Sequence, residues 1–213
     1  MFLHLTNADL PYKLRRKRKQ HSVRPARAPR GESIENRPPE VGERNQFGHW
    51  EMDCVIGKQK TKSVLLALTE RLSRREHIIR MPDKSAASVV RALDRLEKRY
   101  GAIFPKVFRT ITVDNGPEFS DCKKLERSVL YAGNRTKLYY CHPYSSFERG
   151  TNENLNKMIR RRVPKGINIA RIKACDIQQT EDWINNYPRR IFGYETAQMI
   201  FDRELLKLAA TSQ

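Results

Sequence analysis

The chain has 213 residues, with 42 Lys and Arg against 24 Asp and Glu, which gives a formal net charge of +18. Such an excess repels itself unless a polyanion or salt compensates it, so nucleic acid is the first partner to expect. Ribosomal proteins and membrane-surface binders share this composition, and charge says nothing about catalysis. The length suffices for one hydrophobic core, and we expect one folded domain with tails.

The four cysteines, Cys54, Cys122, Cys141 and Cys175, lie far apart and form no Cys-x-x-Cys pair or zinc-finger spacing with histidine. Structural zinc is therefore not expected, and free thiols fit a reducing compartment. No signal peptide opens the sequence, and the longest apolar run, 64–68, is too short to span a bilayer. These features predict a cytoplasmic, nucleoid-associated protein without a membrane partner.

Residues 1–45 contain a basic run over 13–19 and a stretch rich in Pro and Arg, without apolar periodicity. This composition predicts a flexible basic arm or linker. A solvated tail or a localisation signal would look the same, whereas the functional interpretation is an arm that follows DNA phosphates. Its contacts would give affinity without sequence choice, and the candidates are Arg15, Arg16, Lys17 and Arg18.

Short apolar segments begin near Trp50, and three of them, 49–56, 63–69 and 76–80, have the length and spacing of strands. The next segment, 85–100, has apolar residues at helical spacing, with Asp83 or Ser85 at its N-cap and Gly101 as its stop. Further along we expect a strand over 108–113, a helix start at Pro117, a strand over 137–140, and helices over 148–163, 177–186 and 195–209.

Three strands followed by helix, strand, helix, strand and helix is the order of the ribonuclease H-like fold. The fold class expected is therefore α/β, with a mixed five-stranded sheet flanked by helices. We place this domain at 46–205 and a C-terminal tail at 206–213. In this fold the first and fourth strands are neighbours, which brings the residues at their ends together.

Asp53 lies inside the otherwise apolar first strand, where a carboxylate is costly unless it is paired or bound to metal. A charge at a strand edge facing solvent is the simpler explanation. Strand alternation puts Glu51 and Asp53 on one face and Met52 and Cys54 on the other. Glu51 is therefore a rival ligand, and the residues alone do not choose between the two.

Asp114 closes the fourth strand and precedes Asn115-Gly116, a sequence that is often simple turn chemistry. Its place at the carboxyl end of a strand, where α/β active sites collect, favours a functional role. Carboxylates that converge from neighbouring strands could hold two divalent cations for phosphoryl transfer. Such hard oxygen ligands select Mg²⁺ or Mn²⁺.

A third carboxylate should come from a helix beside these strands, and Glu153 shares one helical stripe with Lys157 and Arg160. An ordinary surface ion pair would have the same spacing. Glu148 is the main competitor, although at a helix start it would also suit the helix dipole. The cations after Glu153 are candidates for binding the DNA backbone, with a solvated basic face as the alternative: Lys157, Arg160, Arg161, Arg162 and Lys165.

Three segments together resemble bacterial insertion-sequence transposases of the thirty family (IS-thirty), a DDE group. They are Phe47-Gly48-His49-Trp50-Glu51-Met52-Asp53, Thr112-Val113-Asp114-Asn115-Gly116-Pro117-Glu118-Phe119, and the segment 142–154, His-Pro-Tyr-Ser-Ser-Phe-Glu-Arg-Gly-Thr-Asn-Glu-Asn. Further likeness lies in 160–166 and 183–190, so the resemblance covers about 30–203 of the chain. Each segment alone is weak, but in this order they are specific.

The resemblance implies that the two aspartates and the glutamate of the family correspond to Asp53, Asp114 and Glu153. It implies metal-dependent cleavage at the ends of a mobile element, followed by attack of the released 3′-OH on target DNA. The implied partners are double-stranded DNA, comprising terminal inverted repeats and target, and further copies of the chain, because two ends must be joined. No nucleotide cofactor is implied, and no Gly-rich phosphate loop is present in the sequence.

The sequence departs from the family pattern in three places. Phe147 stands where the family more often has Trp, and 120–136 is longer than in many relatives. Only the basic arm precedes the catalytic domain, where the family usually has a helix-turn-helix region. The alternatives are a nuclease or retroviral-type integrase of the same fold, which would share the acids, and a non-catalytic DNA-binding remnant of a mobile element.

Overall fold

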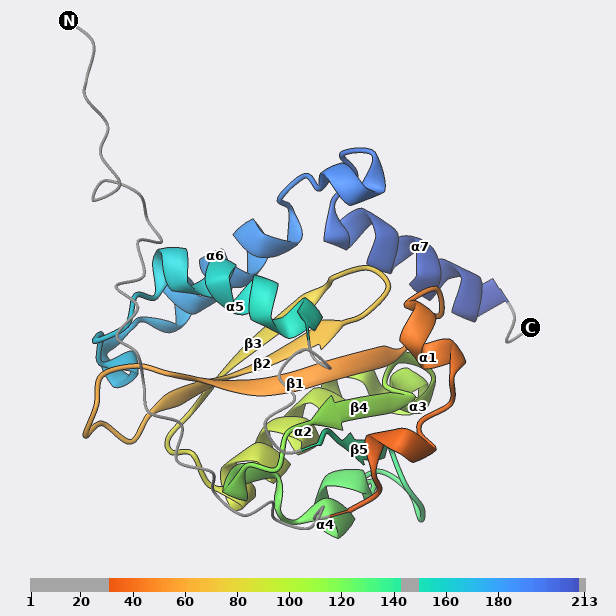
Figure 1. Cartoon of the computed structure of the whole chain (residues 1–213), viewed down its shortest axis with the longest axis horizontal. Helices are drawn as coiled ribbons and strands as arrows, with labels where there is room; N and C mark the ends of the chain where they lie inside the picture. The colour runs from red at the N-terminus through yellow and green to blue at the C-terminus, as the bar shows by residue number, and fades with distance from the viewer. Residues whose placement is uncertain (1–30, 143–149, 211–213) are drawn as a thin grey trace, which may run out of the picture.

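The computed structural model describes residues 31–142 and 150–210. Five strands form one sheet in the order β3-β2-β1-β4-β5 (Figure 1). The first three strands pair antiparallel, and the last two run parallel to β1: β1 (His49–Ile56), β2 (Val64–Glu70), β3 (Glu76–Met81), β4 (Thr110–Val113) and β5 (Lys137–Tyr140). The mixed five-stranded sheet is confirmed, and its strands lie close to the predicted bounds.

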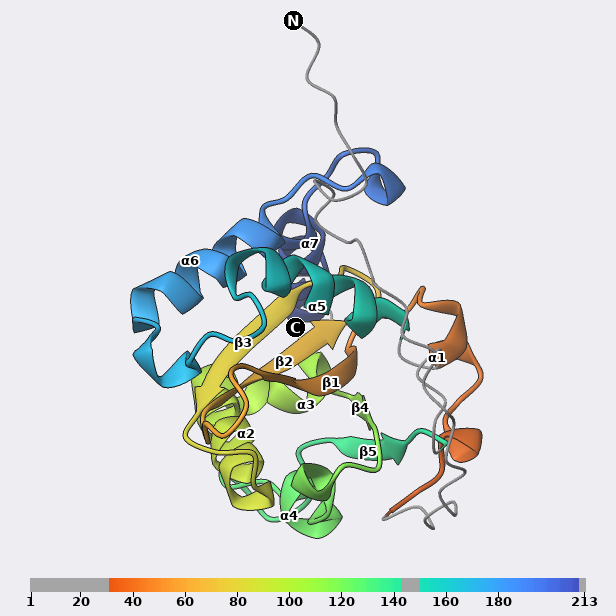
Figure 2. The same cartoon turned by 60° about the vertical axis from the view of Figure 1, so that its left-hand side comes forward.

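Helices cover both faces of the sheet (Figures 1 and 2). One face carries α2 (Ala86–Tyr100) and α4 (Cys122–Glu126), and the other carries α5 (Gly150–Arg162) and α6 (Ala174–Asn185). The remaining helical segments are η1 (Ile34–Asn36), α1 (Glu40–Glu43), η2 (Gly101–Ile103), α3 (Phe104–Val107), η3 (Pro117–Phe119), η5 (Ile169–Arg171), η6 (Arg190–Phe192) and α7 (Ala197–Ala210). Among the described helices, none is both long and apolar enough to cross a membrane.

Alternation along β1 separates two hydrophobic layers. Trp50 and Met52 join the larger core beneath α2, whereas Val55 joins a smaller core formed with α5 and α6. Glu51 and Asp53 share the side of Val55, because successive side chains of a strand point to opposite faces. Both carboxylates therefore face α5, the helix that carries Glu153.

The helix α2 has the boundaries that its sequence predicts. Ser85 is its N-cap and accepts a hydrogen bond from the Ser88 amide, while Asp83 accepts hydrogen bonds from both serine hydroxyls. Gly101 ends the helix at φ 59°, a backbone conformation that residues with a Cβ adopt rarely. The region after Pro117 differs from its prediction: it forms only the short η3 turn, and α4 begins at Cys122.

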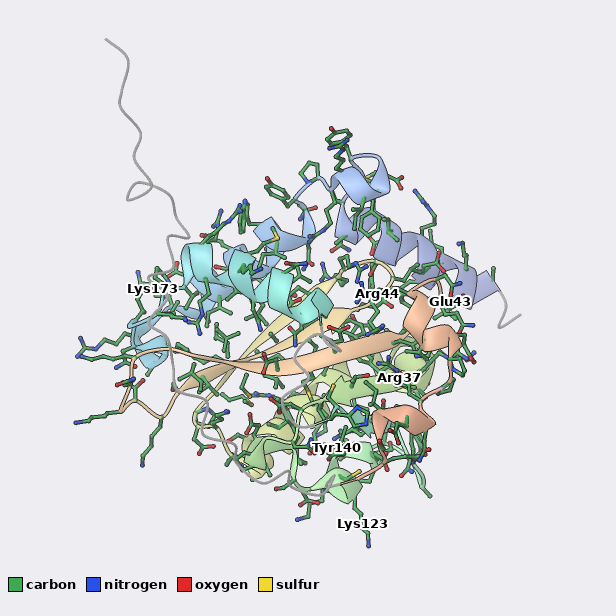
Figure 3. The ribbon with its side chains drawn as sticks, in the orientation of Figure 1. Arg37, Glu43, Arg44, Lys123, Tyr140 and Lys173 are labelled. Carbon is green, nitrogen blue, oxygen red and sulfur yellow. The ribbon has the colours of Figure 1, made fainter. Side chains whose placement is uncertain are left out.

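Residues 31–45, which the sequence assigned to a flexible arm, pack on the domain in the structure. Ser33 forms a parallel bridge with Tyr140 of β5, and Arg37 donates a hydrogen bond to the Thr112 hydroxyl at 3.0 Å (Figure 3). Val41 of α1 is buried. The prediction of flexibility rested on missing periodicity, whereas the segment is held by contacts with residues far away in the sequence. The rest of the predicted arm, 1–30, lies outside the described residues.

The Trp50 side chain is fully buried and organises the larger core. Its ring stacks on Phe108 with centroids 4.3 Å apart, and its indole N–H donates to the Val107 carbonyl at 2.7 Å.

We expect Trp50→Ala to lower the free energy of unfolding by roughly 3–5 kcal/mol, because it creates a cavity and leaves the Val107 carbonyl without its donor. Trp183→Ala, at a half-buried ring on α6, should cost less. Equal losses in urea unfolding would contradict this ranking.

His49 begins β1 and is buried, with Nδ1 2.8 Å from the Thr110 hydroxyl. Burial and the nearby charges of Arg109 and Arg71 lower the pKa of His49 from 6.5 to about 4. Between these values the unfolded chain binds a proton that the folded protein does not, so the stability from neutral His49 is lost as pH falls from 6.5 to 4.

We therefore expect the unfolding free energy of the wild type to fall relative to His49→Gln between pH 7 and pH 4, by on the order of 2–3 kcal/mol. Urea unfolding at several pH values measures the difference, in which other titrating groups cancel. Parallel stability curves for the two proteins would show that His49 titrates normally.

Candidate active site

Asp53 lies in the middle of β1, half-buried beneath α5. Its Oδ1 accepts a hydrogen bond from the Cys54 amide at 2.8 Å, and its Oδ2 accepts one from the Asn156 side chain at 3.0 Å. Asn156 belongs to α5, so the helix contacts the aspartate directly. The carboxylate is thus oriented from two sides while part of it faces solvent.

Asp114 directly follows β4, the parallel neighbour of β1. The register pairs Glu51 with Thr112, and two residues further along each strand the same offset places Asp53 level with Asp114. The Oδ1 of Asp114 accepts a hydrogen bond from the Gly116 amide at 2.9 Å, which fixes the turn after the strand. Parallel pairing therefore brings together two acids that are 61 positions apart in sequence.

Glu153 lies in the first turns of α5, and its side chain is outside the described part of the structure. Asn156, three positions further on, falls on the same side of the helix and contacts Asp53. The backbone of α5 thus places Glu153 about one helical turn before the residue that contacts Asp53. Its competitor Glu148 lies outside the described residues.

The Glu51 carboxylate, the rival of Asp53, is fully buried and has partners on both oxygens. Oε1 accepts from the Arg71 guanidinium at 2.5 Å, and Oε2 accepts from the backbone amide of Asn152 at 2.9 Å. Burial lowers the pKa of Arg71 to about 10, although the charge of Glu51 acts in the opposite direction. Glu51 therefore joins the start of α5 to β1 through a hydrogen bond to Asn152, the residue that precedes Glu153.

Glu118 was not singled out by sequence reasoning, yet it lies beside Asp114. A Cβ on Gly116 would lie 2.6 Å from Glu118 Oε2 and 2.8 Å from Asp114 Oδ1, so both carboxylates approach the same point. Glu118 is buried and pairs through Oε1 with Lys84 at 2.9 Å. The pattern Pro117-Glu118-Phe119 was visible, but burial of its carboxylate depends on α2 packing against η3.

The charges of this cluster act on Cys54 and Lys84. Burial, Glu118 and Asp53 raise the pKa of the Cys54 thiol, which therefore stays protonated at neutral pH. Burial lowers the pKa of Lys84, but the hydrogen bond to Glu118 and the negative charges of Glu118 and Asp114 together outweigh burial, and the net shift is upward. Lys84 accordingly remains a cation beside the acids.

The residues around the aspartates offer oxygen donors that suit a hard divalent cation. Close to the aspartates, three buried side-chain oxygens have no hydrogen-bond partner in the described part of the chain: Asn115 Oδ1, Glu118 Oε2 and Asn156 Oδ1. No group of three His, Cys, Asp or Glu residues able to hold a metal occurs among the described residues, whose side chains do not include that of Glu153. The oxygen donors around the two aspartates are therefore of the kind that such an ion prefers.

The predicted DNA-binding residues of α5 lie along its length. Lys157 and Arg161 are exposed, Arg160 is half-buried and donates to the Ile56 carbonyl at 2.7 Å, and Lys165 is exposed in the loop after the helix. The other four candidates, Arg15, Arg16, Lys17 and Arg18, lie outside the described residues.

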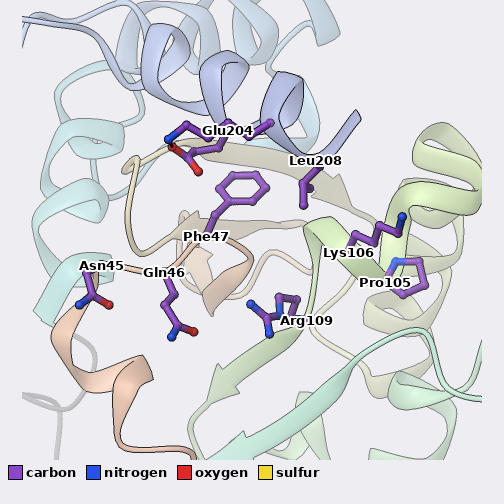
Figure 4. A pocket seen from close by; sticks show the side chains of 9 residues that line it. Asn45, Gln46, Phe47, Pro105, Lys106, Arg109, Glu204 and Leu208 are labelled. Atoms are coloured by element: carbon purple, nitrogen blue, oxygen red, sulfur yellow. Dashed lines mark hydrogen bonds and ion pairs between the residues drawn. The ribbon is translucent and has the colours of Figure 1, made fainter. Parts of the chain in front are cut away.

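A hollow at the other end of the sheet is separate from the acids. It lies before the start of β1 and β4, among Phe47, Lys106, Arg109, Glu204 and Leu208 (Figure 4). Asp53 and Asp114 lie towards the carboxyl ends of the same two strands. The hollow is therefore not part of the candidate active site.

Comparison with known proteins identifies the fold. Residues 43–146 match the family model described as integrase core domain. The structure superposes on the crystal structure of the catalytic core domain of BIV integrase with a TM-score of 0.54 and 18% sequence identity. The superposition covers 79% of this chain and 100% of that chain. The fold is thus the ribonuclease H-like fold of integrase cores.

Curated relatives narrow the class. The chain is 36% identical to a probable transposase for the insertion-like element IS1161 of Streptococcus salivarius, over 94% of this chain and 55% of the relative. It is 35% identical to the transposase of IS4351 from Bacteroides fragilis, over 76% of this chain and 47% of the relative. It is 31% identical to the transposase InsI of IS30A from Escherichia coli (strain K12), over 81% of this chain and 43% of the relative.

These matches define the class of protein: the chain contains an integrase core domain. More particularly, most of its length is similar to part of the transposases of IS1161, IS4351 and IS30A. The chain spans about half the length of the curated relatives it matches.

The buried Glu51–Arg71 pair gives a prediction about the site. Arg71→Met would leave the Glu51 carboxylate buried without its cation, and we expect a loss of roughly 3–5 kcal/mol in the free energy of unfolding. The double substitution Glu51→Gln with Arg71→Met strands no charge, so it should be more stable than Arg71→Met alone. Urea unfolding measures both.

Amide hydrogen exchange gives a second readout of the same pair. In Arg71→Met and in Glu51→Ala the Asn152 amide should exchange faster than in the wild type, because its acceptor is displaced or removed. Amides of α2, which packs on the other face of the sheet, serve as the control. Unchanged exchange at Asn152 would show that Glu51 does not hold the start of α5.

Proposed function

We propose that this chain is the catalytic domain of a DNA transposase that cuts DNA at the ends of a mobile element and joins them to target DNA. The observation that supports it most is the level placement of Asp53 and Asp114 on neighbouring parallel strands, with Asn156 of α5 bonded to Asp53. Similarity to insertion-sequence transposases supports the substrate class, double-stranded DNA.

In this proposal Asp53, Asp114 and Glu153 hold divalent cations, Mg²⁺ or Mn²⁺. Two such ions, when bound, would activate the attacking oxygen and stabilise the leaving oxygen of the phosphodiester. Asn156 and the Cys54 amide orient the Asp53 carboxylate, and the Gly116 amide orients that of Asp114. Glu51 sets the distance between β1 and the first turns of α5, and hence the position of Glu153 relative to the aspartates.

We assign the cations of α5 to binding the phosphate backbone of the DNA. Lys157 and Arg161 are exposed beyond Glu153, and Lys165 continues the series after the helix. Asp53 lies close enough to Arg160 for its negative charge to act on the guanidinium. Phosphates held along this stripe would place the scissile bond next to the acids, since positioning accounts for much of phosphoryl-transfer catalysis.

The basic arm is assigned to further DNA contacts. The described chain begins at Gly31, which packs on Tyr140 at the carboxyl end of β5, the same end of the sheet as Asp114. Arg15, Arg16, Lys17 and Arg18 precede this point and would bind phosphates without sequence choice. Joining two element ends requires a homo-oligomer, and DNA as substrate places the protein in the cytoplasm at the nucleoid.

The proposal is tested by cleavage and strand transfer on labelled duplex DNA that carries the element ends, with Mg²⁺ or Mn²⁺. Asp114→Asn and Glu153→Gln should each reduce both reactions at least about a hundredfold, because each removes a charged ligand worth several kcal/mol in the transition state. DNA binding should survive, since neither residue is a cation. Glu148→Gln is the matched control and should keep activity within a few-fold of the wild type.

The products separate the competing functions. Strand-transfer junctions support a transposase, whereas nicks alone in the presence of target DNA would support a nuclease of the same fold. A chain that binds DNA without reacting, both alone and when extended to the length of its relatives, would be a non-catalytic remnant. Full activity in Asp114→Asn would refute the assignment of the acids.

A further inference from the structure

Half of the formal net charge of the chain lies in two short segments that meet in space. Residues 57–63 connect β1 to β2, and residues 160–173 comprise the end of α5 and its connection to α6. Together the two segments contain nine Lys and Arg and no Asp or Glu. Six of the nine are exposed and belong to the two connections rather than to α5: Lys58, Lys60, Lys62, Lys165, Arg171 and Lys173. These six are called the basic hairpin face below.

The two connections are joined by backbone contacts. The Lys58 amide donates to the Ile167 carbonyl at 2.7 Å, and the Arg160 guanidinium donates to the Ile56 carbonyl at 2.7 Å. A Cβ on Gly57 would lie 2.3 Å from the Ile167 carbonyl oxygen, so the two segments are too close for any side chain there. The basic hairpin face is therefore one surface, with its cations held in place before any partner binds.

The cations of this face differ from several other lysines in their lack of an acidic partner. Lys124, Lys137 and Lys207 each form an ion pair with a nearby carboxylate. In the described ranges, none of the six cations of the basic hairpin face forms such a pair. Cations gathered without counter-charges repel one another, and a polyanion relieves that repulsion.

The face is also continuous with the candidate active site. Asn156 of α5 lies beside Asp53 and Arg160 lies beside Ile56, so α5 and β1 both run from the acids towards the hairpin. Figures 1 and 3 show the β1–β2 connection and Lys173 at one side of the molecule. Lys58 lies five positions after Asp53, which is roughly 16 Å along an extended strand, and a DNA strand advances about 3.4 Å per nucleotide.

We infer that the basic hairpin face binds the phosphate backbone of duplex DNA about five nucleotides from the bond that is cut. This inference rests on the proposed function, because it takes the acids as the point where the DNA enters. A polyanion that extends from Asp53 along α5 meets this face next, and duplex DNA has the length and charge spacing to span both. The contacts are to phosphates, so they add affinity without choosing a sequence.

The test is duplex binding by the full chain, measured by fluorescence anisotropy on a labelled DNA of about 30 base pairs, long enough to cover both sites. The hairpin variant carries Lys58→Gln, Lys60→Gln and Lys62→Gln. The control carries Arg95→Gln, Lys98→Gln and Lys123→Gln, which removes the same charge from exposed positions on α2 and α4, across the sheet from α5 (Figure 3).

We expect the hairpin variant to lower the slope of log affinity against log salt by about two to three, because three counterion-releasing contacts are lost. At about 0.1 M salt its affinity should fall on the order of tenfold, while the control stays within about twofold of the wild type. Equal losses in both variants would reduce the effect to net charge and overturn the inference. Wild-type binding by the hairpin variant would overturn it as well.

Gly57→Ala tests the geometry without removing charge. The added Cβ must push the hairpin away from the 164–168 loop, so duplex affinity should fall although all nine cations remain. Wild-type affinity in this variant would show that the two connections do not act as one surface.

Binding and cleavage can fail separately. If Asp114→Asn cleaves DNA normally, the proposed function is wrong, while the binding comparison still decides the role of the hairpin. If the hairpin and control variants bind alike but Asp114→Asn is inactive, the proposed function stands and the basic hairpin face is refuted.

Discussion

The parallel pairing of β1 with β4 is the constraint on which the site depends. One hydrogen-bonded register, starting at His49 and Thr110, carries Asp53 and Asp114 to the same level. A shift by one residue would turn one of the aspartates to the opposite face, beneath α2. The register is held by apolar residues rather than by the acids, since Trp50 and Ile111 pair across the strands and are both fully buried in the larger core. Core packing thus sets the geometry of the acids.

The buried Glu51–Arg71 pair extends this logic from the sheet to the helix. Glu51 is a costly residue in a strand interior, and its cost is offset only because Arg71 and the start of α5 satisfy its oxygens. The same strand therefore carries one acid with a structural use and, two positions later, one acid left partly open to solvent. The difference between them comes from their partners, since their residue types and their face of the strand are alike.

This difference shows what the sequence could and could not predict. Periodicity and caps sufficed for β1 and for α2, whose ends at Ser85 and Gly101 are local signals. The adjacency of Asp53 and Asp114 followed from the order of strands and helices. The choice between Glu51 and Asp53 needed family resemblance, because alternation puts them on one face. The burial of Glu118 and the folding of residues 31–45 were missed, since both depend on contacts made by segments distant in sequence.

The bridge between Ser33 and Tyr140 has a consequence for the behaviour of the isolated domain. β5 is the last strand of the sheet, and its outer edge would otherwise present unpaired amides and carbonyls to other molecules. The Tyr140 amide instead donates to the Glu32 carbonyl at 2.8 Å, and Lys137 pairs with Glu32. Exposed edges of this kind template intermolecular strand pairing. A soluble catalytic fragment should therefore begin before Gly31, because trimming to the first strand would uncover an aggregation-prone edge.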